Sequence, residues 1–265
     1  MIKALGYVWN LLLVSPLLNL VVFFYKIFDF NMGLAIIAVS ILVKLVTLPF
    51  THSSLKVMQK HKDLMPELEK LKKKYGHDKT RLAEEQLKLY KDMGINPASG
   101  CLTQIVPILM IIALFSVINI FFGNHSSSLE AINTLIYLDF LKIPQGSSIN
   151  PGFLYLNLSK PDPFFILPVL SALLQFLTSK MMMPTLSEAE KLAKKADDVK
   201  DDVMYNMQEQ MLYTAPIIFL IVGLKLPSGV VLNIFVTTLF SLIQQYFVSG
   251  LGGLKPLLGK FGIKT

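Results

Sequence analysis

The chain has 265 residues, of which 53% are hydrophobic and only 16% are charged. Its mean hydropathy of +0.54 exceeds what a soluble domain of this length needs for its core, so the composition indicates an integral membrane protein. The net charge of +7 lies mainly between apolar runs, which is typical of cytoplasmic loops and does not require a nucleic-acid partner. A single cysteine, Cys101, excludes an internal disulfide framework, and four scattered histidines predict no metal site.

Residues 5–28 are apolar and aromatic, with interruptions at Asn10, Ser15, Pro16 and Asn19. The segment has neither the basic start nor the small-residue cleavage site of a signal peptide. Two structures fit it: a membrane span, or an amphipathic helix lying in the membrane interface. Hydropathy alone does not separate them.

Residues 32–51 form an apolar helical run with one lysine, Lys44, inside it. An ammonium at the centre of a bilayer costs about 3 kcal/mol on insertion scales, so it normally faces protein or water. Ser40 and Thr47 lie four residues before and three after Lys44, which places all three on one helical face. This polar stripe predicts a hydrated groove with one fixed charge. The alternative is that Lys44 snorkels to the headgroups from a span that ends before Pro49.

Residues 51–96 are strongly charged, with leucines at helical spacing in two successive runs. Between the runs, we expect Tyr75 to end one helix, Gly76 to form a left-handed cap, and Asp78 to cap the next helix. Pro66 either opens the first helix or marks a kink. The pattern indicates a cytoplasmic helical hairpin at 51–96, whose charges serve solvation unless a partner docks there.

Further apolar runs follow, and lysine-rich segments separate them. Placing these segments inside predicts an all-α polytopic protein with the N-terminus outside and the C-terminus cytoplasmic. The five predicted transmembrane helices lie at about 32–50, 100–122, 163–183, 204–226 and 230–248. The spans at about 100–122, 163–183 and 230–248 also carry polar residues, which serve either as interhelical hydrogen-bonding groups or as walls of the groove. Those singled out for the groove are Gln104, Gln175, Asn233 and Thr237.

Several short motifs recur in a characteristic order and spacing. They are Leu48-Pro49-Phe50-Thr51, Gly76-His77-Asp78-Lys79, Leu89-Tyr90-Lys91, Asn96-Pro97 with Gly100-Cys101, the run from Asp162 to Pro168, Pro227-Ser228-Gly229, and Ile243-Gln244-Gln245. Over about residues 6–248 the chain resembles the YidC-type membrane protein insertase family, which is bacterial with relatives in mitochondria and chloroplasts. Each motif alone is weak, and the set is specific.

The resemblance implies a five-helix bundle in the bacterial inner (plasma) membrane. Residues 1–30 would then form an N-terminal interfacial amphipathic helix, residues 31–250 the insertase core, and residues 251–265 a short basic cytoplasmic tail. The expected form is the short one, without a large periplasmic domain.

The resemblance also implies a membrane protein insertase and chaperone, which is not an enzyme and uses no cofactor. Its clients would be nascent membrane proteins, and its other partners membrane lipids, the ribosome, the signal recognition particle receptor and the Sec translocon. In the family the groove cation is usually arginine. Lys44 keeps the charge without the planar donor fork of arginine.

Two other classes of protein fit the residues: a small transporter or channel with Lys44 as an anion site, and a membrane assembly scaffold. We see no internal repeat that would favour a transporter.

Overall fold

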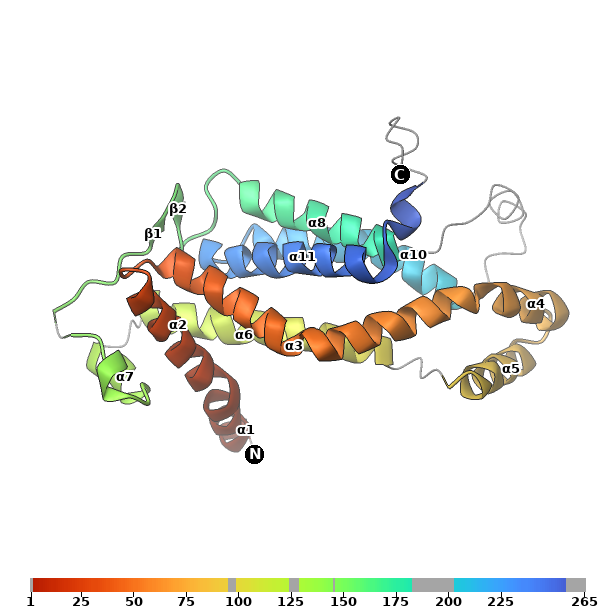
Figure 1. Cartoon of the computed structure of the whole chain (residues 1–265), viewed down its shortest axis with the longest axis horizontal. Helices are drawn as coiled ribbons and strands as arrows, with labels where there is room; N and C mark the ends of the chain where they lie inside the picture. Colours follow the sequence, from red (N-terminus) through yellow and green to blue (C-terminus); the bar gives the residue numbers. More distant parts are fainter. Residues whose placement is uncertain (1, 95–98, 124–128, 145, 183–202, 256–265) are drawn as a thin grey trace. The chain divides into compact units, whose positions relative to one another are not determined.

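The computed structural model describes residues 2–94, 99–123, 129–144, 146–182 and 203–255, and this part of the chain is mostly helical (Figure 1). The longer helices are α1 (Ile2–Trp9), α2 (Ser15–Ile27), α3 (Met32–Asp63), α4 (Met65–Tyr75), α5 (Lys79–Asp92), α6 (Ser99–Phe122), α8 (Ile166–Met182), α10 (Val203–Gly223) and α11 (Ser228–Ser249). The shorter elements are a π-helical turn η1 (Asn10–Val14), α7 (Leu129–Thr134), the 3-10 turns η2 (Asp139–Leu141) and η4 (Gly252–Leu254), and strands β1 (Gly152–Phe153) and β2 (Leu156–Asn157).

Three helical segments of the described chain are long and apolar enough to cross a membrane: Gly6–Ile27, Met32–Ser53 and Ser228–Val248. Shorter apolar helices overlap the other three predicted spans, at Pro107–Phe122, Ile166–Met181 and Leu212–Gly223. The N-terminal segment therefore has the length of a span. Its placement in the membrane interface stays a prediction.

The chain packs as two compact units, and the long helices contribute residues to both. Unit 1 comprises Met1–Thr47, Ile105–Leu174 and Ile217–Phe240. Unit 2 comprises Leu48–Gln104, Gln175–Pro216 and Ser241–Thr265.

The core of unit 1 is apolar and is built from α2, α3, α6, α11 and the connection between α6 and α8. Its fully buried side chains include Leu18, Val22, Ile36, Val39, Leu114, Ile132, Leu158 and Val231. Close helix approach in membrane proteins depends on small residues, because lipid provides little hydrophobic drive between helices. Gly229 is such a residue: a Cβ there would lie 2.7 Å from Ile118 Cδ1 and 3.2 Å from Ile36 Cδ1. A larger residue here would require Ile118 to move, so glycine favours the close approach of α11 to α3 and α6.

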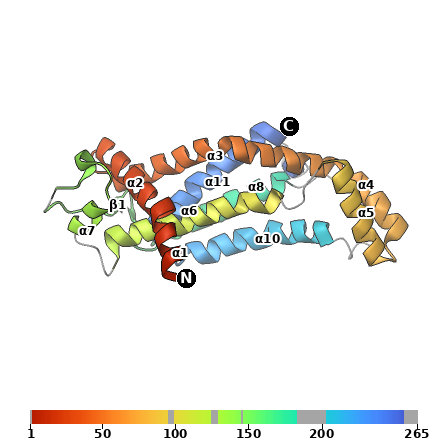
Figure 2. The ribbon, with the colours of Figure 1, turned by 90° about the horizontal axis from the view of Figure 1, so that it is seen from below.

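The described part of the α6–α8 connection, residues 129–144 and 146–165, lies at the end of unit 1 at which α3 and α11 begin. In both views α7 and the β1–β2 hairpin lie at this end, beside the turn that joins α2 to α3 (Figures 1 and 2). The strands are antiparallel and pair Phe153 with Leu156. The ring of Phe153 packs directly on Gly33 in the first turn of α3. The Ser228 backbone N–H donates to the Lys160 carbonyl at 2.7 Å, which attaches the connection to the start of α11.

Helix α3 begins at an asparagine cap and is longer than the predicted span. The Asn31 side-chain oxygen accepts a hydrogen bond from the Leu34 N–H at 3.0 Å, which satisfies one of the unpaired donors of the first turn. The helix then continues through Pro49 to Asp63. The helix thus extends beyond the residue at which the span is expected to end, although proline usually breaks the hydrogen-bonding pattern.

In unit 2, α4 and α5 contact each other across a short turn. Pro66 lies in the first turn of α4. Of the two roles predicted for this proline, the structure shows the one at the start of a helix. The predicted capping role of Asp78 is confirmed, because its side chain accepts a hydrogen bond from the Arg81 N–H at 3.1 Å. The left-handed cap predicted for Gly76 is wrong: its φ of −60° and ψ of −22° are right-handed. The chain reverses instead through the extended backbone of Asp78, whose N–H donates to the Tyr75 carbonyl at 2.9 Å.

Candidate functional site

The polar stripe on α3 starts at Ser40, which is fully buried in unit 1. Its hydroxyl donates to the Ile36 carbonyl one turn earlier, at 2.6 Å. The same oxygen accepts a hydrogen bond from the side-chain amide of Asn233 on α11, also at 2.6 Å. Because Asn233 is 3% exposed, this is a buried hydrogen bond between two apolar helices. Two residues that the sequence singled out from distant segments are thus in direct contact.

The contacts of unit 1 also define the register of α3 against α11. Ser40 and Asn233 are 193 residues apart, and Ile36 lies against Gly229, a pair with the same separation. A constant separation over successive turns means that the helices run in the same direction. One further turn along each helix brings Lys44 and Thr237 to the same level.

Lys44 is the only charged residue within Met32–Ser53, and its side chain is half-buried. Thr47 and Thr237 are also half-buried. The Thr47 hydroxyl donates to the Val43 carbonyl at 2.8 Å, and the Thr237 hydroxyl donates to the Asn233 carbonyl at 2.7 Å. The site therefore contains one lysine and two threonines, all half-buried, beyond a buried Ser–Asn pair.

The contacts described above involve neither of the two other predicted groove residues, Gln175 and Gln104. Gln175 belongs to unit 2, where its amide donates to the Ser179 hydroxyl on the same helix at 3.4 Å. The side chain of Gln104 lies outside the part of the chain whose side chains the structure describes. Unit 2 has its own contact between α3 and α11: the Gln244 amide donates to the Thr51 hydroxyl at 2.9 Å. This pair again spans 193 residues.

In the α4–α5 turn, two cations flank the ring of Tyr75. The Lys74 ammonium lies 5.1 Å from the ring centroid, and the Arg81 guanidinium lies 5.3 Å from it. Both distances suit cation–π attraction. Arg81 is the only arginine of the chain, and the Asp78 cap positions the turn in which it lies.

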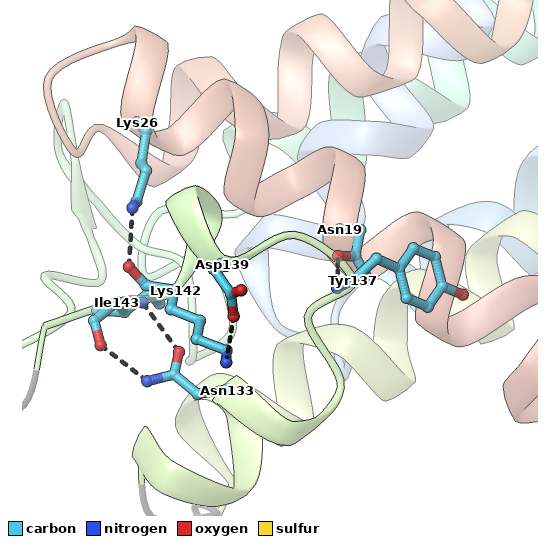
Figure 3. A network of polar contacts seen from close by, with 7 residues as sticks. All are labelled: Asn19, Lys26, Asn133, Tyr137, Asp139, Lys142 and Ile143. Carbon is cyan, nitrogen blue, oxygen red and sulfur yellow. Dashed lines mark hydrogen bonds and ion pairs between the residues drawn. The ribbon is translucent and has the colours of Figure 1, made fainter.

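Sequence reasoning missed the contacts that attach the N-terminal helix to the α6–α8 connection (Figure 3). The Asn19 amide donates to the Leu135 carbonyl at 2.9 Å, and its oxygen accepts from the Tyr137 N–H at 2.8 Å. Two turns further along α2, Lys26 donates to the carbonyls of Phe140 and Lys142, in and directly after η2, at 2.7 and 2.8 Å. In the sequence, only Asn19, a polar residue inside an apolar run, indicated that this helix makes such contacts.

The same connection contains one exposed ion pair. The Lys142 ammonium lies 2.6 Å from the Asp139 carboxylate (Figure 3). The hydrogen bond and the charge of Lys142 lower the pKa of Asp139.

Asp162, the first residue of the motif that ends at Pro168, is a central residue of the connection. Its carboxylate is 1% exposed and accepts hydrogen bonds from the Tyr155 hydroxyl at 3.2 Å and the Leu167 N–H at 2.8 Å. Partial burial, and then the charge of Asp162, raise the pKa of Tyr155. The acid therefore joins the β1–β2 hairpin to the first turn of α8.

The chain is similar to known proteins over most of its length. Residues 23–252 match the model of the family described as "60Kd inner membrane protein". A membrane protein insertase YidC of Fusobacterium nucleatum is 34% identical over 82% of this chain and 86% of its own length. A YidC of Nitratidesulfovibrio vulgaris is 32% identical over 93% of this chain, but the match spans only 40% of that longer protein.

A solved structure is also similar. It is described as an active YidC insertase crystal structure with the first transmembrane domain resolved. The TM-score is 0.56 at 25% sequence identity, and the match covers 88% of this chain and 46% of that one.

The apolar helices and these relatives define a multi-pass protein of the inner membrane. The chain belongs to the family of 60Kd inner membrane proteins, the YidC-type membrane protein insertases. The relatives are named for insertion and not for an enzymatic reaction, and they support neither a transporter nor a scaffold.

Proposed function

We propose that the chain moves hydrophobic segments of nascent membrane proteins from the cytoplasm into the bilayer through a hydrophilic groove that carries the charge of Lys44. The observation that carries the proposal is the position of Lys44. It is the one charge of an apolar segment, and it lies one turn beyond the Ser40–Asn233 pair, level with Thr237. A cation held there attracts an acidic client tail by about 4 kcal/mol at 4 Å for an effective dielectric constant of about 20.

In this proposal, the buried Ser40–Asn233 pair closes one end of the groove, and the half-buried Lys44, Thr47 and Thr237 line it. Gln104 and Gln175 are further wall residues contributed by other helices. Attraction to Lys44 offsets part of the cost of moving a client carboxylate inward. Burial of the client's apolar helix, at roughly 25 cal/mol per Å² of apolar surface, supplies the net drive.

We further propose a five-span core at residues 31–250, an interfacial helix at 1–30 with the N-terminus outside, and a cytoplasmic tail at 251–265. The α4–α5 pair is the cytoplasmic hairpin, with Tyr75, Gly76 and Asp78 at its turn. The lysine-rich segments on that side support this orientation. The hairpin is where we expect the ribosome or the signal recognition particle receptor to dock, and the Sec translocon is a further proposed partner.

The test is insertion of a one-span client with an acidic outer tail into liposomes that contain the purified protein, scored by protection from added protease. We expect wild type and Lys44→Arg to insert the client, and Lys44→Ala to lose most of the protected fraction. Lys225→Ala, which removes an exposed lysine from the turn before α11, is the matched control. A second client with a neutral tail should depend less on Lys44.

Equal insertion by wild type, Lys44→Arg and Lys44→Ala would show that Lys44 has a snorkelling or structural role while the protein remains an insertase. If none of the variants exceeded empty liposomes, although a control insertase inserted the same client, the proposed activity would be wrong.

A further inference from the structure

Two large, exposed apolar residues of the α6–α8 connection have a backbone with positive φ, which disfavours side chains of their size. Leu154 is the first residue of the two-residue turn between β1 and β2, a position where glycine is favoured because φ is positive. Its φ is 53°, and its side chain is 86% exposed. Phe165, immediately before α8, has a φ of 57° and is also exposed. Such conformations disfavour bulky side chains and persist where the surrounding structure imposes them, often at functional positions.

The two residues belong to one surface, because a buried acid joins their segments. Asp162 accepts hydrogen bonds from Tyr155 in the hairpin turn and from the Phe164 N–H at 3.0 Å. The rings of Tyr155 and Phe164 are 5.8 Å apart. We name Leu154, Phe164 and Phe165 the tip patch. All three side chains are more than half exposed.

The tip patch lies at the end of an apolar span. The Lys160 carbonyl accepts hydrogen bonds from both the N–H and the hydroxyl of Ser228, each at 2.7 Å. Ser228 is the first residue of the candidate span Ser228–Val248, so this contact sets the level of the connection along the helices. The patch also continues directly into exposed apolar side chains of the first turn of α8, Ile166 and Val169.

We propose that the tip patch inserts into the lipid interface, with its apolar side chains at the boundary between headgroups and acyl chains. Aromatic side chains are enriched at this depth, and a nearby lysine can direct its ammonium to the lipid phosphates. Lys160 is exposed and lies between Leu154 and Phe164 in the chain, so its ammonium can reach such a phosphate. Lipid fits better than a second protein because the patch is continuous with the apolar surface of α8. The inference does not depend on the insertase activity.

The experiment uses tryptophan fluorescence in vesicles. The only tryptophan is first removed by Trp9→Phe, and Leu154→Trp or Phe165→Trp is then introduced. Ser148→Trp is the control, because Ser148 is exposed in the same connection but does not belong to the tip patch. Each protein is reconstituted into phosphatidylcholine vesicles whose acyl chains carry bromine at a shallow or a deep position, with unbrominated vesicles as reference.

We expect Leu154→Trp and Phe165→Trp to lose emission in brominated vesicles, most strongly with shallow bromine, while aqueous iodide quenches mainly Ser148→Trp. Two results overturn the proposal. Quenching of the patch positions by iodide alone would place them in water. Protection from both quenchers would place them in a contact between proteins. Unchanged circular dichroism and gel-filtration profiles in detergent establish that the variants are folded.

Discussion

The hydrogen bonds of the Ser40–Asn233 pair predict that its two members contribute unequally to stability. Ser40 retains a partner when Asn233 is removed, because its hydroxyl also donates to the Ile36 carbonyl. Removing Ser40, in contrast, leaves the buried Asn233 amide without the acceptor that it has now. An unsatisfied buried donor costs about 1–3 kcal/mol, whereas losing both partners together can be nearly neutral.

We therefore predict that Ser40→Ala lowers the free energy of unfolding by about 1–3 kcal/mol, and that adding Asn233→Ala costs less than the sum of the single changes. The measurement is a double-mutant cycle from unfolding of the purified protein in detergent. Ser116→Ala is the control, since the Ser116 hydroxyl donates to a carbonyl of its own helix at 3.0 Å. Additive effects at Ser40 and Asn233 would mean that their contact contributes no coupling energy.

At the scale of elements, the start of α3 depends on a residue without a side chain. Gly33 lets the Phe153 ring pack directly on the helix backbone, which attaches the β1–β2 hairpin to unit 1. The N-terminal helix is attached to the same connection by Asn19 and Lys26. Three elements that are separate in the sequence are thus joined at one end of unit 1.

We predict that Gly33→Ala destabilises the protein by about 1–3 kcal/mol, the usual range for an overpacked contact, because the new Cβ overlaps the Phe153 ring. Thermal unfolding in detergent measures this, and Phe153→Ala in the Gly33→Ala background should recover part of the loss. Gly6→Ala is the matched control, since nothing lies within 4 Å of a Cβ at Gly6. If both substitutions had the same small effect, the Phe153 contact would be unimportant for stability.

At the scale of the whole molecule, the orientation in the membrane decides how the groove meets its clients. Two arrangements of the N-terminal helix are open, because Gly6–Ile27 is long enough to span and is also attached to the α6–α8 connection by Asn19. An interfacial helix leaves Tyr7 on the outer side. A spanning helix places Tyr7 inside.

Single-cysteine labelling distinguishes these arrangements. In a Cys101→Ser background, we predict that a membrane-impermeant maleimide labels Ser148→Cys in intact cells, and labels Lys88→Cys on α5 only after permeabilisation. Tyr7→Cys should behave like Ser148→Cys if the N-terminal helix is interfacial. Labelling of Lys88→Cys in intact cells would reverse the proposed orientation.

Local patterns were sufficient for much of this protein. Helical periodicity placed Ser40, Lys44 and Thr47 on one face of α3, because spacing along a helix depends only on the helix itself. The Asp78 cap was predictable for the same reason, since its acceptor and donor are three residues apart. Gly76 shows the limit: several backbone conformations can close a short turn, and glycine permits more than one.

The partners of these residues were decided by the tertiary structure. Nothing near Ser40 in the chain identifies Asn233 as its partner, and Asn19 is 118 residues from Tyr137. The parallel register that brings Thr237 level with Lys44 is visible only in contacts between the two helices, such as that of Gly229 with Ile36. The sequence thus determined which residues are polar within apolar helices. Packing between distant segments determined which of them meet, because side-chain contacts form only when whole helices are in register.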